Sequence, residues 1–349
     1  MEAPDIPSTM RAAVLHRLGD RLAVEEWPVP EPGPGEILIR VIACGVCHSD
    51  VHAVDGDWDP PPNLPLIPGH EVTGRVVGLG SESDGVAVGD LVGVPWMFWS
   101  CGVCEWCLAG METICPVTEA TGYSKPGGYA EYMVAPAAFV ARLPETVDPI
   151  ALAPILCAGV TTYRGLKRTT ARPGQWVAIL GIGGLGHVAV QYAVAMGLRV
   201  VAVDIGADKL ALARSLGAEV TIDAASADAV VAVRDAVGGV HASLVTAVAP
   251  IAFQQAVAML RPAGTAVYIG LPGGASDEIR SSIAMVVNGE LTVRGSNVGT
   301  RADLNEAVDF AVRGHIAATV ASAPLSRIND IFDDLRAGRV VGRIVVTPD

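Results

Sequence analysis

The pattern of apolar positions divides the chain into two stretches. Up to about residue 150, short β-branched runs alternate with turns rich in proline and glycine. Such runs are typical of short strands joined by loops, because Gly and Pro interrupt extended structure. The runs lie at Glu36–Ile42, Val72–Val77 and Tyr129–Val134. The pattern therefore predicts a compact β-rich region with long functional loops.

Beyond about residue 160, the pattern predicts strands that alternate with helices. The predicted strands are Trp176–Leu180, Leu198–Asp204, Leu244–Val248 and Thr265–Gly270, and the predicted helices are Gly186–Met196, Asp208–Leu216 and Ile251–Leu260. This alternation indicates an α/β fold, in which a parallel sheet carries helices on both faces. A further helix is predicted at Ala302–Arg313. We expect the last apolar run, Gly342–Thr347, to rejoin the sheet of the first stretch.

Composition and charge narrow the class of protein. Apolar residues make up 51% of the chain, and Trp176–Leu198 is long enough to cross a bilayer. Its glycines and its strand-like first half favour a buried strand, turn and helix instead. The net charge of −13 opposes binding to nucleic-acid phosphates and to anionic lipid. We therefore expect neither nucleic acid nor a membrane as a partner.

Cysteine usage indicates the compartment. The chain has 7 cysteines in clustered positions, and Met1–Thr9 is polar, without the apolar core of a secretory signal. An odd, clustered set in such a chain favours thiolate–metal sites in a reducing cytosol over a disulfide framework. The sequence therefore predicts a cytoplasmic protein.

The densest metal-ligand pattern is a run of four cysteines, namely Cys101, Cys104, Cys107 and Cys115. Thiolates on tight turns can surround tetrahedral zinc at about 2.3 Å. Four sulfurs leave no coordination position open, so the pattern predicts a structural zinc. The alternative is a non-enzymatic zinc module that binds nucleic acid or protein, which the acidic charge makes less favourable.

A glycine pattern follows the first predicted strand of the second stretch. It consists of Gly181, Gly183, Gly184 and Gly186, and it opens a predicted helix. In that context G-x-G-x-x-G is typical of dinucleotide binding, because the backbone and the helix N-terminus can meet a pyrophosphate. Asp204 ends the next strand, where a carboxylate accepts hydrogen bonds from a ribose and repels a 2′-phosphate. NAD is therefore favoured over NADP. Lys209 either reaches the same ribose or is a solvated residue at a helix start.

A second set of metal-ligating residues is spread along the chain. Cys44 and Cys47 lie in one segment, and His70 and Cys157 lie further along. A catalytic zinc takes three protein ligands and keeps one position open. His70 and Cys157 with either Cys44 or Cys47 would supply this set, and the spacing does not choose between the two cysteines. Alternatively, Cys44 and Cys47 form a redox-active C-x-x-C pair.

These motifs resemble those of the zinc-dependent alcohol dehydrogenases of the medium-chain dehydrogenase/reductase superfamily, and most of all their short-looped microbial branch. The resemblance extends from Met10 to the C-terminus. It rests on Gly45–Asp50, Gly69–Glu71, the four-cysteine run, Ala153–Gly159, the glycine turn and Val341–Arg343. It implies a GroES-like catalytic domain at 1–158 and 297–349, with a structural zinc lobe at about 96–116. A Rossmann NAD-binding domain would occupy 159–296.

The resemblance also implies a role for each candidate residue. Cys47, His70 and Cys157 match the ligands of the catalytic zinc, with Asp50 and Glu71 beside them. Ser49 matches a hydroxyl that contacts the substrate oxygen, and His52 matches the outer end of a proton relay. Positions that contact the cofactor are matched by His48, Thr161, Leu185 and Arg343, and positions that line the substrate pocket by Trp58 and Trp96.

The function implied by this resemblance is the reversible oxidation of short-chain primary alcohols to aldehydes, with hydride transfer to NAD. Two indoles would leave a narrow pocket suited to small, unbranched substrates. The implied enzyme holds two zinc ions per chain and assembles as a homotetramer. An NADPH-preferring aldehyde reductase on the same scaffold is the alternative, and Asp204 argues against it.

Overall fold

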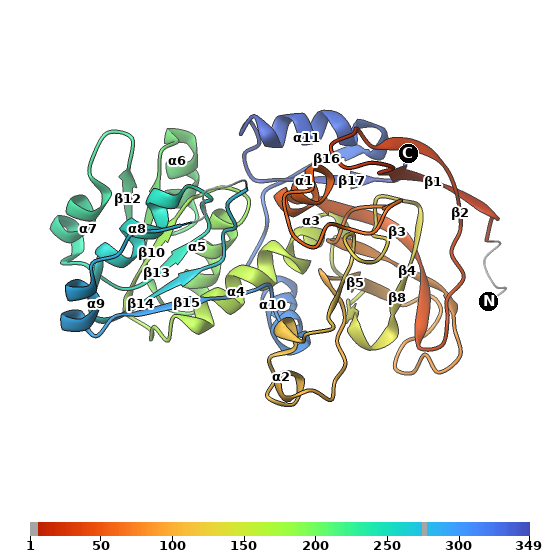
Figure 1. The fold of residues 1–349 in the computed structure, drawn as a ribbon, viewed down its shortest axis with the longest axis horizontal. Coiled ribbons are helices and arrows are strands. Elements are labelled where there is room, and N and C mark those ends of the chain that lie inside the picture. Colours follow the sequence, from red (N-terminus) through yellow and green to blue (C-terminus); the bar gives the residue numbers. More distant parts are fainter. Residues whose placement is uncertain (1–5, 274–277) are drawn as a thin grey trace. The chain divides into compact units, whose positions relative to one another are not determined.

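The structure is a computed structural model that describes residues 6–273 and 278–349. It consists of two compact units. The first contains the described residues up to Cys157, together with Gly299–Val312 and Ala318–Asp349. The second contains the described residues of Ala158–Val298, together with Arg313–Ala317. Both units are drawn in Figure 1.

The first unit is built on a seven-stranded sheet with the order β16-β17-β3-β4-β5-β9, in which β8 also pairs with β3. Its strands are β3 (Glu36–Val46), β4 (Val72–Leu79), β5 (Leu91–Val94), β8 (Tyr132–Pro136), β9 (Ala141–Arg142), β16 (Val320–Pro324) and β17 (Arg343–Thr347). The pairing of β17 with β3 confirms that the last strand joins the sheet of the first stretch. A segment from the end of the chain thereby completes the sheet that carries Cys44 and Val46.

Shorter elements complete this unit. They are β1 (Thr9–Val14), β2 (Ala23–Pro28), α1 (His48–Asp55), β6 (Met97–Trp99), α2 (Glu105–Leu108), η1 (Glu112–Ile114), β7 (Glu119–Ala120), η2 (Ala137–Phe139), α3 (Pro149–Leu152), η3 (Ala153–Leu156), α10 (Arg301–Val312), η4 (Leu325–Arg327) and α11 (Ile328–Arg336). One buried cluster, which includes Leu15, Ile37, Val72, Tyr129 and Phe332, packs the sheet against α11. Burial of this apolar surface is the main stabilising contribution.

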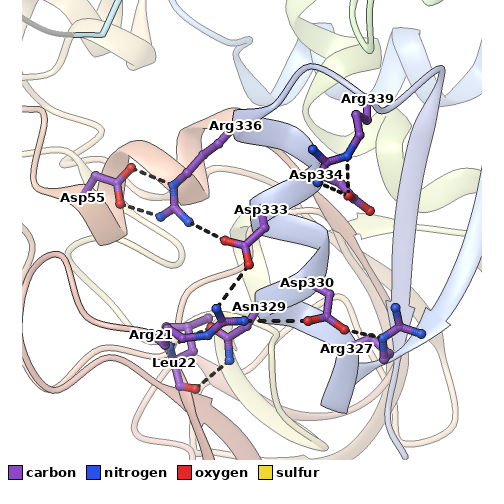
Figure 2. A network of polar contacts seen from close by, with 10 residues as sticks. All are labelled: Arg21, Leu22, Asp55, Arg327, Asn329, Asp330, Asp333, Asp334, Arg336 and Arg339. Atoms are coloured by element: carbon purple, nitrogen blue, oxygen red, sulfur yellow. Dashed lines mark hydrogen bonds and ion pairs between the residues drawn. The ribbon is translucent and has the colours of Figure 1, made fainter.

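Helix α11 is tied by ion pairs to helix α1 and to the loop that precedes β2. Asp55 at the end of α1 accepts hydrogen bonds from Arg336 Nε at 3.2 Å and from Arg336 Nη2 at 2.5 Å. Asp333 of α11 accepts a hydrogen bond from Arg21 Nη1 at 3.2 Å. Figure 2 shows Asp55 and Arg21 next to the polar side chains of α11. Beneath them, α11 presents Ile328, Ile331, Phe332 and Leu335 to the core at the spacing of one helix face. The C-terminal end of α1 is therefore held by the Asp55–Arg336 ion pair at the surface as well as by its buried side chains.

The second unit is a parallel sheet of six strands with the order β12-β11-β10-β13-β14-β15. This order is that of a doubly wound dinucleotide-binding fold, and helices flank the sheet in Figure 1. The strands are β10 (Trp176–Leu180), β11 (Arg199–Asp204), β12 (Val220–Asp223), β13 (Val240–Val245), β14 (Leu260–Tyr268) and β15 (Thr292–Gly295). The helices are α4 (Ala158–Arg168), α5 (Gly186–Ala195), α6 (Ala207–Ser215), α7 (Ala229–Val237), α8 (Pro250–Ala258) and α9 (Ile283–Gly289).

The expected α/β class with a β-rich first region is confirmed, but some expected bounds were wrong. The strand expected at Leu244–Val248 is β13 (Val240–Val245), because the chain turns directly after Val245. The strand expected from Thr265 begins earlier, at Leu260. Trp176–Leu198 forms a strand, a turn and a helix, as preferred from the sequence. Among the described residues, none of the helices has the length and apolarity needed to span a bilayer.

Candidate active site and metal centres

Cys47 stands at the start of α1 because of the residues that follow it. Its backbone N–H donates to Asp50 Oδ2 at 2.9 Å, which forms the carboxylate half of a capping box. The helix ends at Gly56, whose φ of 75° closes the last turn in the left-handed conformation. Cys47, Ser49 and His52 are therefore held on one short, doubly capped helix.

Asp50 also holds His70. Its Oδ1 lies 2.8 Å from His70 Nδ1, and its Oδ2 accepts the Tyr129 hydroxyl at 2.6 Å. All three side chains are buried, and Gly69 donates its N–H to Asp50 Oδ1 at 3.3 Å. Because the carboxylate accepts from Nδ1, the lone pair of His70 lies on Nε2. Burial lowers the pKa of His70, but Asp50 and Cys47 together outweigh burial and raise that pKa well above its ordinary value.

The donor atoms of Cys47, His70, Glu71 and Cys157 all lie within 4.8 Å of one another. His70 Nε2 has no hydrogen-bond partner within the described part of the chain, although it is buried. The hydrogen bond with Cys157 lowers the pKa of Cys47 well below normal, and the same contact raises the pKa of Cys157 well above normal. The two thiols thus share one proton, with Cys47 the more acidic. A divalent cation would allow both to ionise, because it stabilises both thiolates. Two sulfurs and one unpartnered imidazole nitrogen therefore fit zinc.

Glu71 lies against the same cluster and pairs with Arg343. The Arg343 Nη2 donates to Glu71 Oε1, and both side chains are buried. Burial raises the pKa of Glu71 to about 7, although Arg343 opposes this shift. Gly45 provides the space, because a Cβ at that position would lie 1.9 Å from Glu71 Oε2. The expected cofactor contact of Arg343 stays a prediction, whereas its burial excludes an ordinary surface arginine.

The second donor cluster contains Cys101, Cys104, Cys107 and Cys115, again within 4.8 Å of one another. Backbone N–H groups point at its sulfurs, since Cys104 N lies 3.3 Å from Cys101 Sγ and Cys107 N lies 3.5 Å from Cys104 Sγ. The backbone N–H groups of Val103 and Cys104 lower the pKa of Cys101 to about 6. This all-sulfur set fits a closed tetrahedral zinc.

An aromatic wall connects the buried donor cluster with His52. Trp96 meets the His70 ring edge-on at 4.8 Å, and Trp58 lies 6.2 Å from Trp96 and 5.1 Å from His52, measured between ring centres. Tyr123 lies 5.9 Å from both indoles. The structure therefore places Trp96 against His70 and Trp58 between Trp96 and His52.

The neighbours of Cys47 on α1 also lie where polar chemistry is possible. Ser49 Oγ lies 3.7 Å from Cys47 Sγ. The His48 and His52 rings are 6.3 Å apart, and burial lowers the pKa of His48. Cys44 is buried outside the donor cluster, and burial raises the pKa of its thiol well above normal. Cys47, and not Cys44, is therefore the cysteine that meets His70 and Cys157.

In the second unit the glycine turn joins β10 to α5. A Cβ at Gly186 would lie 1.9 Å from the Gly181 carbonyl oxygen, so only glycine allows this approach of helix and strand. At Gly183 an added Cβ meets no described atom within 4 Å. Leu185 is the N-cap residue of α5, and its turn leaves the helix N-terminus directed to this open side. The turn therefore has the room that a pyrophosphate requires.

Asp204 at the end of β11 is held by three backbone donors. They are Ile182 N at 2.5 Å, Ile205 N at 2.7 Å and Gly206 N at 2.9 Å. A Cβ on Gly206 would lie 3.3 Å from Lys209 Cδ and 3.5 Å from Asp204 Oδ1, so Lys209 lies beside the carboxylate. In α4, Thr161 Oγ1 is buried and has no partner among the described residues. These groups fit a nicotinamide dinucleotide.

Sequence reasoning missed three contributors to the site. Tyr129 supports Asp50 from a position 79 residues away, and no local signal marks it. Arg301 anchors the lobe through Glu112, with its Nε 2.9 Å from Glu112 Oε1. Asp57 contacts His52, and it was detectable, since a polar residue directly after a helix-ending glycine often folds back on the last turn.

Comparisons with known proteins agree with this geometry. Residues 33–145 match the model of the alcohol dehydrogenase GroES-like domain, and residues 184–313 match that of the zinc-binding dehydrogenase. An alcohol dehydrogenase of Moraxella sp. (strain TAE123) is 52% identical over 337 residues, which cover 97% of this chain and 99% of that protein.

Solved structures are similar over the whole chain. The alcohol dehydrogenase of the hyperthermophilic archaeon Aeropyrum pernix has a TM-score of 0.89 at 33% identity, covering 97% of this chain and 100% of that one. The cobalt- and zinc-bound thermostable alcohol dehydrogenase of Pyrobaculum aerophilum has a TM-score of 0.86 at 30% identity, with the same coverage of 97% and 100%. This chain therefore belongs to the zinc-dependent alcohol dehydrogenases of the medium-chain dehydrogenase/reductase superfamily, a family of oxidoreductases.

Proposed function

We propose that this protein oxidises short primary alcohols to aldehydes, reversibly, with zinc and NAD. The observation that carries the proposal is the buried set of Cys47, His70 and Cys157, in which His70 Nε2 lacks a partner among the described residues. Membership of the family gives the reaction class. The positions of the side chains support the finer assignments.

The proposed metal content is two zinc ions per chain. One would be held by Cys47, His70 and Cys157, and the other by the four cysteines of the lobe. The mixed set leaves a position open for substrate, whereas the all-sulfur set is closed. Metal analysis of the purified protein tests this stoichiometry, and one zinc per chain would contradict it.

The side chains divide the chemical work between them. Bound at these sites, zinc would supply Lewis acidity at the alcohol oxygen and NAD would accept the hydride. Asp50 keeps the His70 lone pair on Nε2. The Ser49 hydroxyl can accept a hydrogen bond from the substrate and pass its proton on. His52, one helical turn later and partly exposed, can accept a proton and release it to water.

The proposed substrates are short and unbranched. Trp96 lies against His70, Trp58 lies against Trp96, and Tyr123 packs against both indoles. Two large rigid rings leave little width for a branched group. We expect a higher kcat/KM for ethanol or 1-propanol than for bulky secondary alcohols.

The proposed cofactor is NAD and not NADP. Three backbone donors hold the Asp204 carboxylate in place, and its two oxygens have further lone pairs for a ribose diol. The fixed negative charge would repel a 2′-phosphate. We assign cofactor binding to the domain at 159–296, and metal and substrate binding to the domain formed by 1–158 and 297–349.

A homotetramer in the cytoplasm is also proposed. In the described chain β15 is the last strand of its sheet, and Ile283 and Val287 of α9 are 81% and 65% exposed. An open edge beside exposed apolar side chains favours association with another copy. The seven cysteines are free thiols, which supports a reducing compartment. Light scattering tests the assembly and cell fractionation tests the location.

One experiment tests the proposed function as a whole. The purified protein is assayed with a panel of alcohols and aldehydes against NAD and NADP, and metal content is measured on the same sample. We expect turnover of short primary alcohols with NAD, at two zinc ions per chain. Absence of turnover in the zinc-loaded protein would contradict the proposal.

A further inference from the structure

Directly after α1 the chain folds back over His52. The backbone N–H groups of Gly56 and Asp57 both donate to the His52 carbonyl oxygen, at 3.0 and 3.1 Å. This turn returns the Asp57 side chain to the imidazole, and Asp57 Oδ2 lies 2.7 Å from His52 Nδ1. The turn that ends α1 therefore places the Asp57 carboxylate against the His52 ring.

The loop that carries Asp57 is held in place by its neighbours. Tyr123 donates its hydroxyl to the Pro60 carbonyl oxygen at 2.7 Å, and Asn63 Nδ2 donates to the Ser124 carbonyl oxygen at 3.2 Å. Trp58 covers the His52 ring on the side of the aromatic wall. These contacts hold the loop, and with it the Asp57 side chain, in place beside His52.

The pair contributes little to stability. The side chains of His52 and Asp57 are 12% and 31% exposed, and ion pairs near solvent are worth about 0–1 kcal/mol. The carboxylates that precede Asp57 on the helix have other partners, because Asp50 contacts His70 and Tyr129. Asp55 accepts hydrogen bonds from Arg336. Among the described residues, Asp57 is the carboxylate that contacts the His52 ring.

We propose that Asp57 is the positioning residue for His52 as proton acceptor, an inference that rests on the proposed function. An ionised carboxylate only accepts hydrogen bonds, so it keeps the proton on Nδ1 and leaves the Nε2 lone pair free. Oxidation of an alcohol releases one hydride and one proton. A bound nicotinamide cofactor would accept the hydride, and His52 Nε2 would accept the proton and release it to water. While His52 is a cation, the Asp57 carboxylate stabilises it.

The contact between Asp57 and His52 thus repeats the contact between Asp50 and His70. Asp50 holds Nδ1 of His70 at 2.8 Å, so that Nε2 faces the donor cluster. Asp57 holds Nδ1 of His52 at 2.7 Å, so that Nε2 is available for a proton. In both pairs the carboxylate selects the tautomer.

The kinetic test compares Asp57→Asn with Asp59→Asn, in the parent and in a His52→Gln background. Asn both donates and accepts, so it no longer dictates the tautomer. Asp59 is exposed on the same loop, so Asp59→Asn removes the same charge without touching His52. We expect Asp57→Asn to lower kcat about tenfold in the parent, a part of a typical acid–base contribution, and to have no effect with His52→Gln. An equal loss in both backgrounds, or an equal loss for Asp59→Asn, would overturn the proposal.

A second readout does not depend on turnover. In protein labelled with ¹⁵N-histidine, the His52 signals are assigned by their loss in His52→Gln. We expect the Nδ1–H tautomer in the parent and in Asp59→Asn, and a mixture of tautomers in Asp57→Asn. The Nε2–H tautomer in the parent, or no change in Asp57→Asn, would contradict the inference. If the parent fails to oxidise alcohols while the tautomers behave as expected, the proposed function fails and the assignment of the pair stands.

Discussion

The two cysteine-containing clusters of the first unit differ in how their donor atoms are held. In the cluster of Cys47, His70 and Cys157, the donors come from distant segments and are buried. A carboxylate, Asp50, orients the histidine. In the lobe, all donors lie between Cys101 and Cys115, and backbone N–H groups orient the sulfurs.

This difference separates a centre for chemistry from a centre for structure. A local all-sulfur set can form as the lobe folds, and it closes a short segment around a metal. A mixed set drawn from the whole unit forms only when the sheet, α1 and η3 are in place. The His70 ring, whose Nε2 has no hydrogen-bond partner among the described residues, packs edge-on with Trp96. The first set therefore stabilises the lobe, and the second depends on the folded unit and can bind substrate.

The largest expected effect comes from breaking the mixed set. His70→Ala or Cys47→Ser should reduce turnover to background, because the remaining donor of the cluster, Glu71, is held by its ion pair with Arg343. Metal content should fall from two zinc ions to one, while NAD still binds. Cys44→Ala, a buried cysteine outside the cluster, is the control. Near-parent kcat in a metal-loaded His70→Ala protein would show that the two clusters had been assigned wrongly.

Asp50→Asn tests whether the carboxylate distinguishes the two centres. Loss of an outer-shell partner of a metal-bound histidine typically costs about 10–100-fold in metal affinity or activity. We expect a loss of that size in zinc affinity at the mixed set, measured by competition with a chelator. Retention of zinc in the lobe is the internal control. Equal loss from both clusters would indicate general unfolding instead.

Breaking the lobe should affect stability more than turnover. Cys104→Ser should remove one zinc and lower the melting temperature by about 5 °C or more, because a structural metal contributes directly to folding. The kcat of the remaining folded enzyme at 25 °C should stay within about twofold of the parent, as the cysteines of the lobe lie outside the mixed set. Thermal unfolding and initial rates on one preparation separate the two effects. A collapse of kcat at unchanged melting temperature would reverse the assignment.

The smallest expected effect is that of Tyr129→Phe, which removes the 2.6 Å hydrogen bond to Asp50. A hydrogen bond to a charged group is worth about 1.5–3 kcal/mol, so denaturant unfolding should detect the loss. Burial raises the pKa of Tyr129 well above normal. The hydroxyl therefore stays a donor at neutral pH, and the loss should be the same at pH 6 and pH 8. Tyr132→Phe is the control, and a pH-dependent loss would contradict this role.

The sequence predicted elements well where local signals were strong. The apolar run at Trp176–Leu180 and the glycines after it place β10 and α5 correctly. Helix α11 was missed, although Ile328, Ile331, Phe332 and Leu335 follow a helical period. Its acidic and basic residues obscured that period, and they are the residues that pair with α1 and with Arg21.

The site was predictable to the extent that its motifs are local. Resemblance selected Cys47 over Cys44, and the structure brings Cys47, His70 and Cys157 together. The pairing of Glu71 with Arg343 joins residues 272 positions apart. Only the pairing of β17 with β3 brings Arg343 into this unit's sheet, so no local pattern could predict the contact.

The most direct test of the central claim is anomalous diffraction at the zinc absorption edge, from crystals of the zinc-loaded protein. We predict two peaks per chain. One should lie among Cys47, His70 and Cys157 with a position open to solvent or substrate, and the other among the four sulfurs of the lobe. A single peak at the lobe, with the other three side chains apart from any metal, would contradict the account.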